Sequence, residues 1–395
     1  MPDGPETFSP QVLERLADVP RAAWDACAGA ENPFVSFDFL SCLEDSGSAA
    51  PATGWTPRHI VVKDNATGQI LACAPVYLKT HSMGEYVFDW GWAEAYERAG
   101  GAYYPKLLCA VPFTPATGPR LLVRSDLPQP RQTELKRLLA DTLAGLAERA
   151  GVSSIHVNFI GDRDVQALHE AHFLPRVGLQ YHWQNNGYQS FDYFLNELSS
   201  RKRKAIKRER RAVIEAGLSI ERLSGSAITE AHWDAMFAFY QDTGSRKWGR
   251  PYLNREFFRL LGERLKDRVL LVIAKRPHDD AIIAGALNLI GADALYGRYW
   301  GCAEDVAFLH FELCYHQAIE AAIERGLSRV EAGAQGEHKI ARGYLPVFTR
   351  SAHFIADAGL RDAVAGFCAS ERRAVEHEFQ ILMKESPYRQ NGDRG

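Results

Sequence analysis

The chain has 395 residues, a length that predicts about two domains. Hydrophobic residues make up 46% of the sequence and charged residues 24%, proportions that exclude disordered and fibrous proteins. The formal net charge is −3, so the chain as a whole is not built to coat a nucleic acid, and any site for a polyanion must be local.

The first half of the sequence predicts a short series of strands followed by a helix. Three strands rich in β-branched and aromatic residues, joined by short turns, are expected at 58–63, 69–78 and 85–90. Helical periodicity follows at 135–150, ended by Gly151, and a further strand is expected at 154–159. This order of elements is typical of an α/β unit with a mixed sheet.

The middle of the chain, 191–217, predicts helical structure with a basic run. Eight of the eleven residues in 201–211 are lysine or arginine, and Glu209 is the one acid among them. Ile206 and Val213 are seven residues apart and could fix one helix face, which would leave the cations free for a polyanion. The alternative is a helix face that is merely solvated. The residues expected to bind a polyanion are Arg201, Lys204, Lys207 and Arg208.

The second half repeats the pattern of the first. A helix at 229–240 precedes three strands, a helix and a strand, expected at 268–275, 281–290, 295–300, 308–325 and 328–332. A last amphipathic helix is expected at 360–384. The repeat predicts two units, residues 1–185 and residues 186–395, of which the second contains the basic segment 199–217 and the C-terminal helix.

The chain also carries four motifs: Asn32-Pro-Phe-Val-Ser-Phe-Asp-Phe-Leu40, Tyr103-Tyr-Pro-Lys106 with Pro112-Phe-Thr-Pro115, Gln180-Tyr-His-Trp-Gln184, and Gly333-Ala-Gln-Gly-Glu-His-Lys-Ile-Ala-Arg-Gly343. Together with the repeated strand–helix–strand cores, they resemble the FemAB-like family of peptidoglycan biosynthesis or recognition proteins, within the GNAT acyltransferase superfamily. The resemblance covers nearly the whole chain. It implies a mixed α/β fold of two tandem GNAT-like acyltransferase units with helical insertions.

The resemblance also implies the reaction, transfer of an acyl or aminoacyl group to an amine. The implied acceptor is an anionic small molecule or a muropeptide, and tRNA is a candidate partner. GNAT enzymes bind coenzyme A with a glycine-rich loop at a helix N-terminus. The equivalent loop here, 301–308, has one glycine and two acids, and Fem-type proteins, which use aminoacyl-tRNA, lack the glycine-rich loop too. We expect no tightly bound cofactor and either acyl-CoA or aminoacyl-tRNA as co-substrate.

Such a transfer needs a base for the amine and hydrogen-bond donors for the carbonyl oxygen. Glu312 falls on the apolar face of the expected helix 308–325, where a desolvated carboxylate suits a general base; a glutamate paired with a buried arginine is the alternative. Glu331 lies on the following strand, and the loop after it is expected at the edge of the sheet where α/β proteins bind ligands. The candidate catalytic residues are Glu312, Glu331 and, within that loop, His338.

The same loop supplies the expected substrate contacts. Gly336 permits close backbone approach, and Lys339 and Arg342 could hold a phosphate or carboxylate, unless they are simply solvated. Arg298, mid-strand between aromatic residues, is expected to pair with Glu312 or Glu331. The remaining expected substrate contacts are Glu337 and, by resemblance, Tyr104 and Lys106 of the first unit, where aromatic packing is the alternative for the tyrosines.

Location and metal content follow from simpler features. The most apolar uncharged run, Ala281–Ala292, is shorter than the ~20 residues of a membrane-spanning helix, so we expect no membrane span. Residues 1–11 lack a signal peptide's basic segment and apolar core, so the expected location is the cytoplasm. The seven scattered cysteines predict reduced, mostly buried thiols, and no metal site is expected. Three tryptophans are expected in the core, namely Trp90, Trp92 and Trp183.

The sequence therefore predicts an N-acyl or aminoacyl transferase acting on a small or cell-wall-precursor amine. The alternative is a non-catalytic protein that recognises a peptidoglycan precursor or a nucleotide sugar. The hypothesis of an RNA-binding protein has less support, because it depends on the basic run alone.

Overall fold

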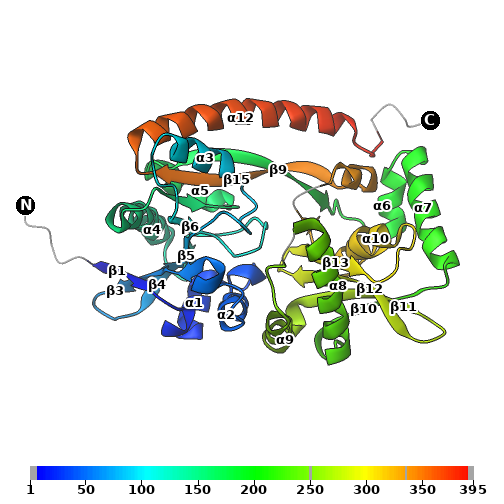
Figure 1. The fold of residues 1–395 in the computed structure, drawn as a ribbon. Coiled ribbons are helices and arrows are strands. Elements are labelled where there is room, and N and C mark those ends of the chain that lie inside the picture. Colours follow the sequence, from blue (N-terminus) through cyan, green and yellow to red (C-terminus); the bar gives the residue numbers. More distant parts are fainter. Residues whose placement is uncertain (1–6, 249–250, 334–335, 390–395) are drawn as a thin grey trace, which may run out of the picture. The chain divides into compact units, whose positions relative to one another are not determined.

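The computed structural model describes residues 7–248, 251–333 and 336–389. The chain forms two compact units: unit 1 contains Met1–Gly178 and Phe348–Val375, and unit 2 contains Leu179–Val347 and Glu376–Gly395. The chain leaves unit 1 within strand β9 (Leu174–Gln184), returns within β15 (Leu345–Ile355) and crosses again within helix α12 (Ala358–Lys384) (Figure 1).

The fold-class prediction, a mixed α/β fold, is confirmed. The first crossing lies close to the predicted boundary at 185–186, but the prediction that all later residues belong to the second unit differs from the structure. The reason is strand pairing: β15 pairs with a strand of unit 1, β8, through partners such as Ala352 and Val157.

Unit 1 contains two groups of strands. One sheet has the order β1-β3-β4-β7, and the strands of unit 1 in the second sheet have the order β2-β5-β6-β8-β15. Its remaining bounds are β1 (Phe8–Leu13), α1 (Arg21–Ala28), α2 (Phe37–Asp45), β2 (Trp55–Pro57), β3 (His59–Asp64), β4 (Ile70–Ala74), β5 (Val76–Lys79), α3 (Trp90–Arg98), β6 (Lys106–Cys109), β7 (Leu122–Val123), α4 (Gln129–Ala150), β8 (Ser154–Val157) and α5 (Asp162–Glu170).

Of the predicted strands of this unit, 69–78 is wrong in part and 85–90 is wrong altogether. The expected strand 69–78 is divided into β4 and β5, which belong to different sheets, and Pro75 lies between them. Proline cannot donate to a strand ladder, so it marks the point where the chain changes sheets. Residues 85–89 form a loop, because Glu85 and Asp89 turn inward to buried lysines and Tyr86 has a left-handed φ of 59°.

The core of unit 1 forms where amphipathic helix α4 covers the sheets. Its buried residues recur at helical spacing, as in Leu135, Leu139 and Leu143, and they join one apolar cluster with β3, β4 and β8. The helix ends at Gly151, whose φ of 62° and ψ of 29° give the left-handed cap that the sequence predicted.

Unit 2 reproduces the predicted second copy closely. Its strands have the order β10-β11-β12-β13-β14-β9, and β13 and β14 run parallel. Its bounds are α6 (Phe191–Glu197), α7 (Ser200–Glu215), β10 (Ser219–Leu223), α8 (Glu230–Trp248), α9 (Arg255–Arg264), β11 (Val269–Arg276), β12 (Ala281–Ile290), β13 (Ala294–Cys302), α10 (Leu309–Phe311), the π-helix η6 (Glu312–His316), α11 (Gln317–Glu324), β14 (Arg329–Glu331) and the 3-10 turn η7 (Glu337–Arg342).

Two local features of unit 2 bear on function. The predicted helix 308–325 contains a π-helical turn, η6, a geometry that occurs often at functional sites. Gly301 lies in β13, where a Cβ atom would lie 2.4 Å from the carbonyl oxygen of Phe239 in α8. This glycine therefore permits close helix–strand packing.

The thiol prediction is confirmed, since all seven cysteines are free and five are buried. Trp92 and Trp183 are buried as predicted. The prediction for Trp90 is wrong, because this residue begins α3 and is 50% exposed. Within the described residues, no helix is both long and apolar enough to cross a membrane.

Candidate functional site

The glycine-bracketed turn predicted at 333–343 is a compact 3-10 turn, η7, that follows β14. Residues 334–335 lie outside the described residues. Gly336 has a φ of 117°, and a Cβ atom there would lie 2.5 Å from the ring of His338, so the turn requires glycine. The side chains of the candidate catalytic residue His338 and the predicted contact Glu337 are exposed, whereas the predicted contacts Lys339 and Arg342 are buried.

Arg342 joins the turn to helix α7. Its guanidinium makes two hydrogen bonds to Glu209, at 2.7 and 3.1 Å, and donates a third to the carbonyl oxygen of His338 at 2.7 Å. Burial alone would raise the pKa of Glu209, but its contacts with His316 and Arg342 outweigh burial and lower it. A charged carboxylate therefore fixes Arg342, and a ligand could use this guanidinium only by competing with Glu209.

Glu312 forms a similar pair. It is 3% exposed at the start of η6, and Arg210 of α7 donates to both of its oxygens, at 2.9 and 3.1 Å. Gln317 donates a further bond of 2.7 Å, and Arg210 also contacts Glu320. This arrangement is the alternative considered for Glu312, a glutamate paired with an arginine. Its role as a catalytic base stays a prediction.

Glu331 and Arg298 have other neighbours than predicted. Glu331 is buried and accepts a hydrogen bond of 3.0 Å from Arg329, with His182 at 3.7 Å. Burial lowers the pKa of His182, so this imidazole is neutral at pH 7. Both carboxylates expected to pair with Arg298 thus have a different arginine partner, and Arg298 lies 5.2 Å from the ring of Tyr299.

His338 is the candidate base with an exposed side chain. Its Nε2 atom lies 2.9 Å from the hydroxyl oxygen of Tyr315, which belongs to the π-helix and is 3% exposed. Burial raises the pKa of Tyr315, so its hydroxyl remains neutral and can orient the imidazole. The rings of His310 and Phe311 lie within 6.1 Å and 5.8 Å of His338. The sequence analysis missed Tyr315, because no sequence signal announces a π-helical turn.

Lys339 is bound beneath the turn. Its side chain is 3% exposed, donates a hydrogen bond of 3.1 Å to the carbonyl oxygen of Gly333 and lies 5.9 Å from the ring of Tyr181. The contact with Gly333 connects the beginning of the loop to η7. A role in substrate binding stays a prediction for Lys339.

Helix α7 exposes the predicted basic face. Ile206 and Val213 are each 1% exposed and anchor the helix, as expected from their spacing. Glu209 turns inward to Arg342, so the exposed face of 201–211 carries no acid of its own. Lys207 lies 3.7 Å from Asp192 in an exposed pair of low strength. The four predicted polyanion contacts, Arg201, Lys204, Lys207 and Arg208, all have exposed side chains.

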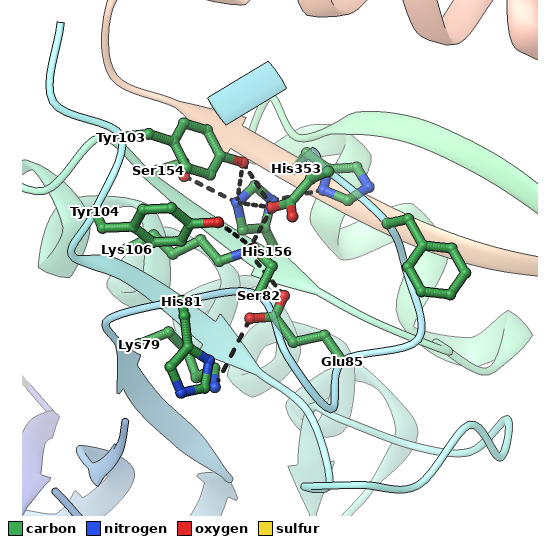
Figure 2. A network of polar contacts seen from close by, with 12 residues as sticks. Lys79, His81, Ser82, Glu85, Tyr103, Tyr104, Lys106, Ser154, His156 and His353 are labelled. Carbon is green, nitrogen blue, oxygen red and sulfur yellow. Dashed lines mark hydrogen bonds and ion pairs between the residues drawn. The ribbon is translucent and has the colours of Figure 1, made fainter. Parts of the chain in front are cut away.

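In unit 1 the predicted residues Tyr104 and Lys106 belong to one buried polar network (Figure 2). Lys106 is fully buried and donates to Ser82 and Glu85 at 2.8 Å each and to Asp89. The hydroxyl groups of Ser82 and Tyr104 are 2.8 Å apart. Sequence reasoning missed the two carboxylates, because it assigned this segment to a strand.

The same network continues through neutral side chains to β15. The Tyr103 hydroxyl donates to Asp89 at 2.7 Å and lies 3.2 Å from Nε2 of His156, whose Nδ1 lies 2.7 Å from Nδ1 of His353 (Figure 2). Burial, together with the Lys106 charge, lowers the pKa of His156 to about 3, and burial also lowers the pKa of His353 well below its ordinary value. For the tyrosines, the alternative to a substrate contact was aromatic packing. That alternative describes Tyr103, which is fully buried.

The described residues contain no group of three or more histidine, cysteine, aspartate or glutamate side chains arranged to bind a metal ion.

Comparisons with known proteins agree with this architecture. Over 88% of this chain and 98% of the other, the structure superposes on a crystal structure of FemX with a TM-score of 0.55 at 12% sequence identity. L-PGS from Bacillus licheniformis matches at 10% identity with a TM-score of 0.49, covering 92% of this chain and 99% of that one. A tandem GNAT protein from the clavulanic acid biosynthesis pathway matches at 11% identity with a TM-score of 0.45, covering 89% and 99%.

No curated protein matches the sequence. The model of the FemAB-like family, described as peptidoglycan biosynthesis/recognition, matches residues 15–390. The FemX comparison shows that the two chains share a fold. With nearly its whole length matched, the chain belongs to the FemAB-like family of peptidoglycan biosynthesis and recognition proteins.

Proposed function

We propose that the protein transfers an acyl or aminoacyl group to the amine of a small or cell-wall-precursor acceptor, in the manner of a Fem-type enzyme. The observation that carries the proposal is the pair formed by His338 and Tyr315 on the glycine-bracketed turn. Of the three candidate catalytic residues, His338 is the one whose side chain is exposed, whereas Glu312 and Glu331 are buried in ion pairs. A cytoplasmic location stays part of this proposal.

In the proposed reaction the imidazole of His338 accepts the proton that the attacking amine loses. The amine nitrogen forms a bond to the acyl carbon, and the bond from that carbon to the donor's oxygen or sulfur breaks, so the leaving group departs with the electron pair and takes up a proton. Tyr315 fixes the ring orientation, and the Arg342 bond to the His338 carbonyl fixes the backbone. General-base catalysis of this kind contributes about 10²–10⁴-fold to a rate.

The donor proposed is aminoacyl-tRNA, with acyl-CoA as the second choice. Two observations favour it. Gly301, the one glycine of the segment where GNAT enzymes bind the coenzyme A pyrophosphate, serves the packing of α8. The exposed cations of α7 form a surface with the charge that a phosphate backbone requires. The acceptor is proposed to be an anionic small molecule or a muropeptide.

A non-catalytic protein that recognises a peptidoglycan precursor or a nucleotide sugar is the second candidate. It is favoured by the ion pairs of Glu312, Glu331 and Arg342, which leave the site with few groups for proton transfer. The family's description includes recognition as well as biosynthesis.

One assay separates the two functions. Binding is measured first as the thermal shift caused by acetyl-CoA, UDP-linked muropeptide or aminoacyl-tRNA, and transfer is then measured under single-turnover conditions. In the His338→Gln variant we expect transfer to fall at least ~100-fold with little change in thermal stability. His377→Gln, the same replacement at an exposed position of α12, is the matched control and should keep full transfer. Ligand binding without transfer in the unmodified protein would instead establish the recognition function.

A further inference from the structure

Unit 1 buries four charged side chains in one place. Lys79 and Lys106 come from neighbouring strands, and Glu85 and Asp89 come from the loop that precedes α3. The two lysines are fully buried, Glu85 is 4% exposed and Asp89 is 3% exposed. We call these four residues the buried charge cluster. It contains two cations and two carboxylates, so its formal charge is zero when all four are ionised.

The carboxylates of the cluster have more acceptor atoms than the protein supplies donors. Lys106 occupies Oε2 of Glu85 and Oδ2 of Asp89, and Tyr103 also donates to the latter. Within the described residues, Oε1 of Glu85 and Oδ1 of Asp89 have no hydrogen-bond partner. A buried acceptor without a donor costs about 1–3 kcal/mol, so both atoms are places where an added donor would be stabilising.

Lys79 has more hydrogen-bond donors than its surroundings use. Its Nζ atom makes one hydrogen bond, a long one of 3.4 Å to the carbonyl oxygen of Met83, and lies 3.5 Å from the ring centroid of Trp55. It is 4.0 Å from Oε1 of Glu85. A dashed line joins the two side chains in Figure 2. An ammonium group can donate three hydrogen bonds, so Lys79 has donors to offer on the side of the cluster where Glu85 lacks one.

Partly exposed residues adjoin the buried charge cluster. His81 and Tyr104, which neighbour it in Figure 2, are half-buried, and Met83 is 49% exposed. The loop from 80 to 89 contains no helix or strand, and Gly84 and Tyr86 adopt left-handed φ angles of 80° and 59°. Because the cluster is buried, a small molecule would reach the oxygens of Glu85 and the ammonium of Lys79 only if these residues moved aside.

We propose that the buried charge cluster binds the zwitterionic end of a free amino acid, with the ammonium group on Glu85 Oε1 and Asp89 Oδ1 and the carboxylate on Lys79. The charges favour this class over a simple amine or a simple acid. A zwitterion leaves the cluster neutral, whereas a lone ammonium or a lone carboxylate would leave one uncompensated charge in a buried place. The site goes beyond the proposed transfer reaction, because it lies in unit 1 and would bind a free amino acid, whereas the proposed transfer depends on His338 of unit 2.

The test is calorimetric titration of the full chain with three probes: glycine, methylamine and acetate. Glycine has both charges, and each of the others has one. We expect saturable binding of glycine, and binding of the other two at least ~10-fold weaker, a difference of about 1.4 kcal/mol. Equal affinity for methylamine and glycine, or no saturable glycine binding in the unmodified protein, would overturn the proposal.

Two variants locate the site. Glu85→Gln should weaken glycine binding at least ~10-fold, and Glu97→Gln, on the exposed side of α3, should not change it. If Glu85→Gln does not fold, Lys79→Met provides the same test through the carboxylate contact. Unchanged affinity in a folded variant of either kind would contradict the assignment. His338→Gln should bind glycine like the unmodified protein, so failure of the transfer proposal would leave this result intact.

Discussion

The two units use buried charge in different ways. In unit 1 four charged groups converge on one another, and Lys106 alone contacts both carboxylates. In unit 2 two arginine–carboxylate pairs each join two elements: Arg210 of α7 to η6, and Arg342 of η7 to Glu209 of α7. A central cation stabilises a local cluster, whereas a pair between two elements also sets their relative position. The difference predicts that the lysines of unit 1 govern stability and that the arginines of unit 2 also govern the geometry of His338.

The largest loss of folding stability is expected at Lys106, the centre of the buried charge cluster. Burial alone would lower the pKa of Lys106, but the charges of Glu85 and Asp89 outweigh burial and raise it, so this lysine is charged. Lys106→Met would leave two buried carboxylates without their cation, which costs about 3–5 kcal/mol. Urea unfolding monitored by circular dichroism measures this loss. Arg149→Met, at an exposed position of α4, should change stability by less than about 0.5 kcal/mol. A cost for Lys106→Met no greater than that control would contradict the comparison.

In unit 2 we expect a smaller loss of folding stability, together with a loss of transfer activity. Arg342→Met would remove the partner of Glu209 and the bond to the His338 carbonyl, and we expect about 2–3 kcal/mol of destabilisation. His338 would also lose its backbone contact. The transfer rate, measured well below the melting temperature, should therefore fall by more than the loss of folded protein explains. Arg325→Met, at the exposed C-terminal end of α11, is the control. Full transfer by a folded Arg342→Met protein would show that the pair does not position His338.

The second buried lysine sharpens the comparison, because its pKa moves the other way. Burial, only partly offset by Glu85, lowers the pKa of Lys79 from 10.5 to about 7. Since the folded state binds this proton less tightly, stability should rise with pH from about 7 to 10.5. Lys79→Met should therefore cost much less than Lys106→Met at pH 7 and should flatten that rise. Unfolding free energies at pH 7, 8 and 9 measure both effects, and an unchanged slope in the variant would be the contrary result.

The smallest effect on folding and a distinct effect on binding are expected for α7. Replacing Arg201, Lys204 and Lys207 by glutamine should leave stability almost unchanged, since all three are exposed. It should weaken binding of tRNA and reduce the slope of log affinity against log salt by about 2–3. The control replaces three exposed cations of the second unit outside α7. A salt slope identical to that of the unmodified protein would exclude this face as the polyanion site.

The sequence was informative where local patterns decide the structure. Strands β11, β12 and β13 follow from apolar runs between turn residues, and the buried faces of α4 and α7 follow from helical spacing. It also identified the turn between Gly336 and Gly343, because glycine is required there by its backbone angles. The family assignment rests on motifs of the same local kind.

What it could not supply were partners distant in the chain. The helical periodicity predicted that Glu312 is buried, but its partner, Arg210, lies 102 residues away and leaves no local signal. The inward turn of Glu85 and Asp89 is likewise set by Lys106 and overrides the strand-like composition of 85–90. Tyr315 meets His338 because η6 is π-helical, and a standard helical wheel does not anticipate that geometry.

The threefold passage of the chain between the units has a practical consequence for dissecting the protein. A fragment that stops at Gly178 would lack Phe348–Val375, and strand β8 would lose the partner that β15 provides. The exposed edge would invite self-association, so such a fragment should precipitate. A gene that joins residue 178 to residue 348 through a flexible linker would preserve that pairing and is the rational way to produce the first half by itself.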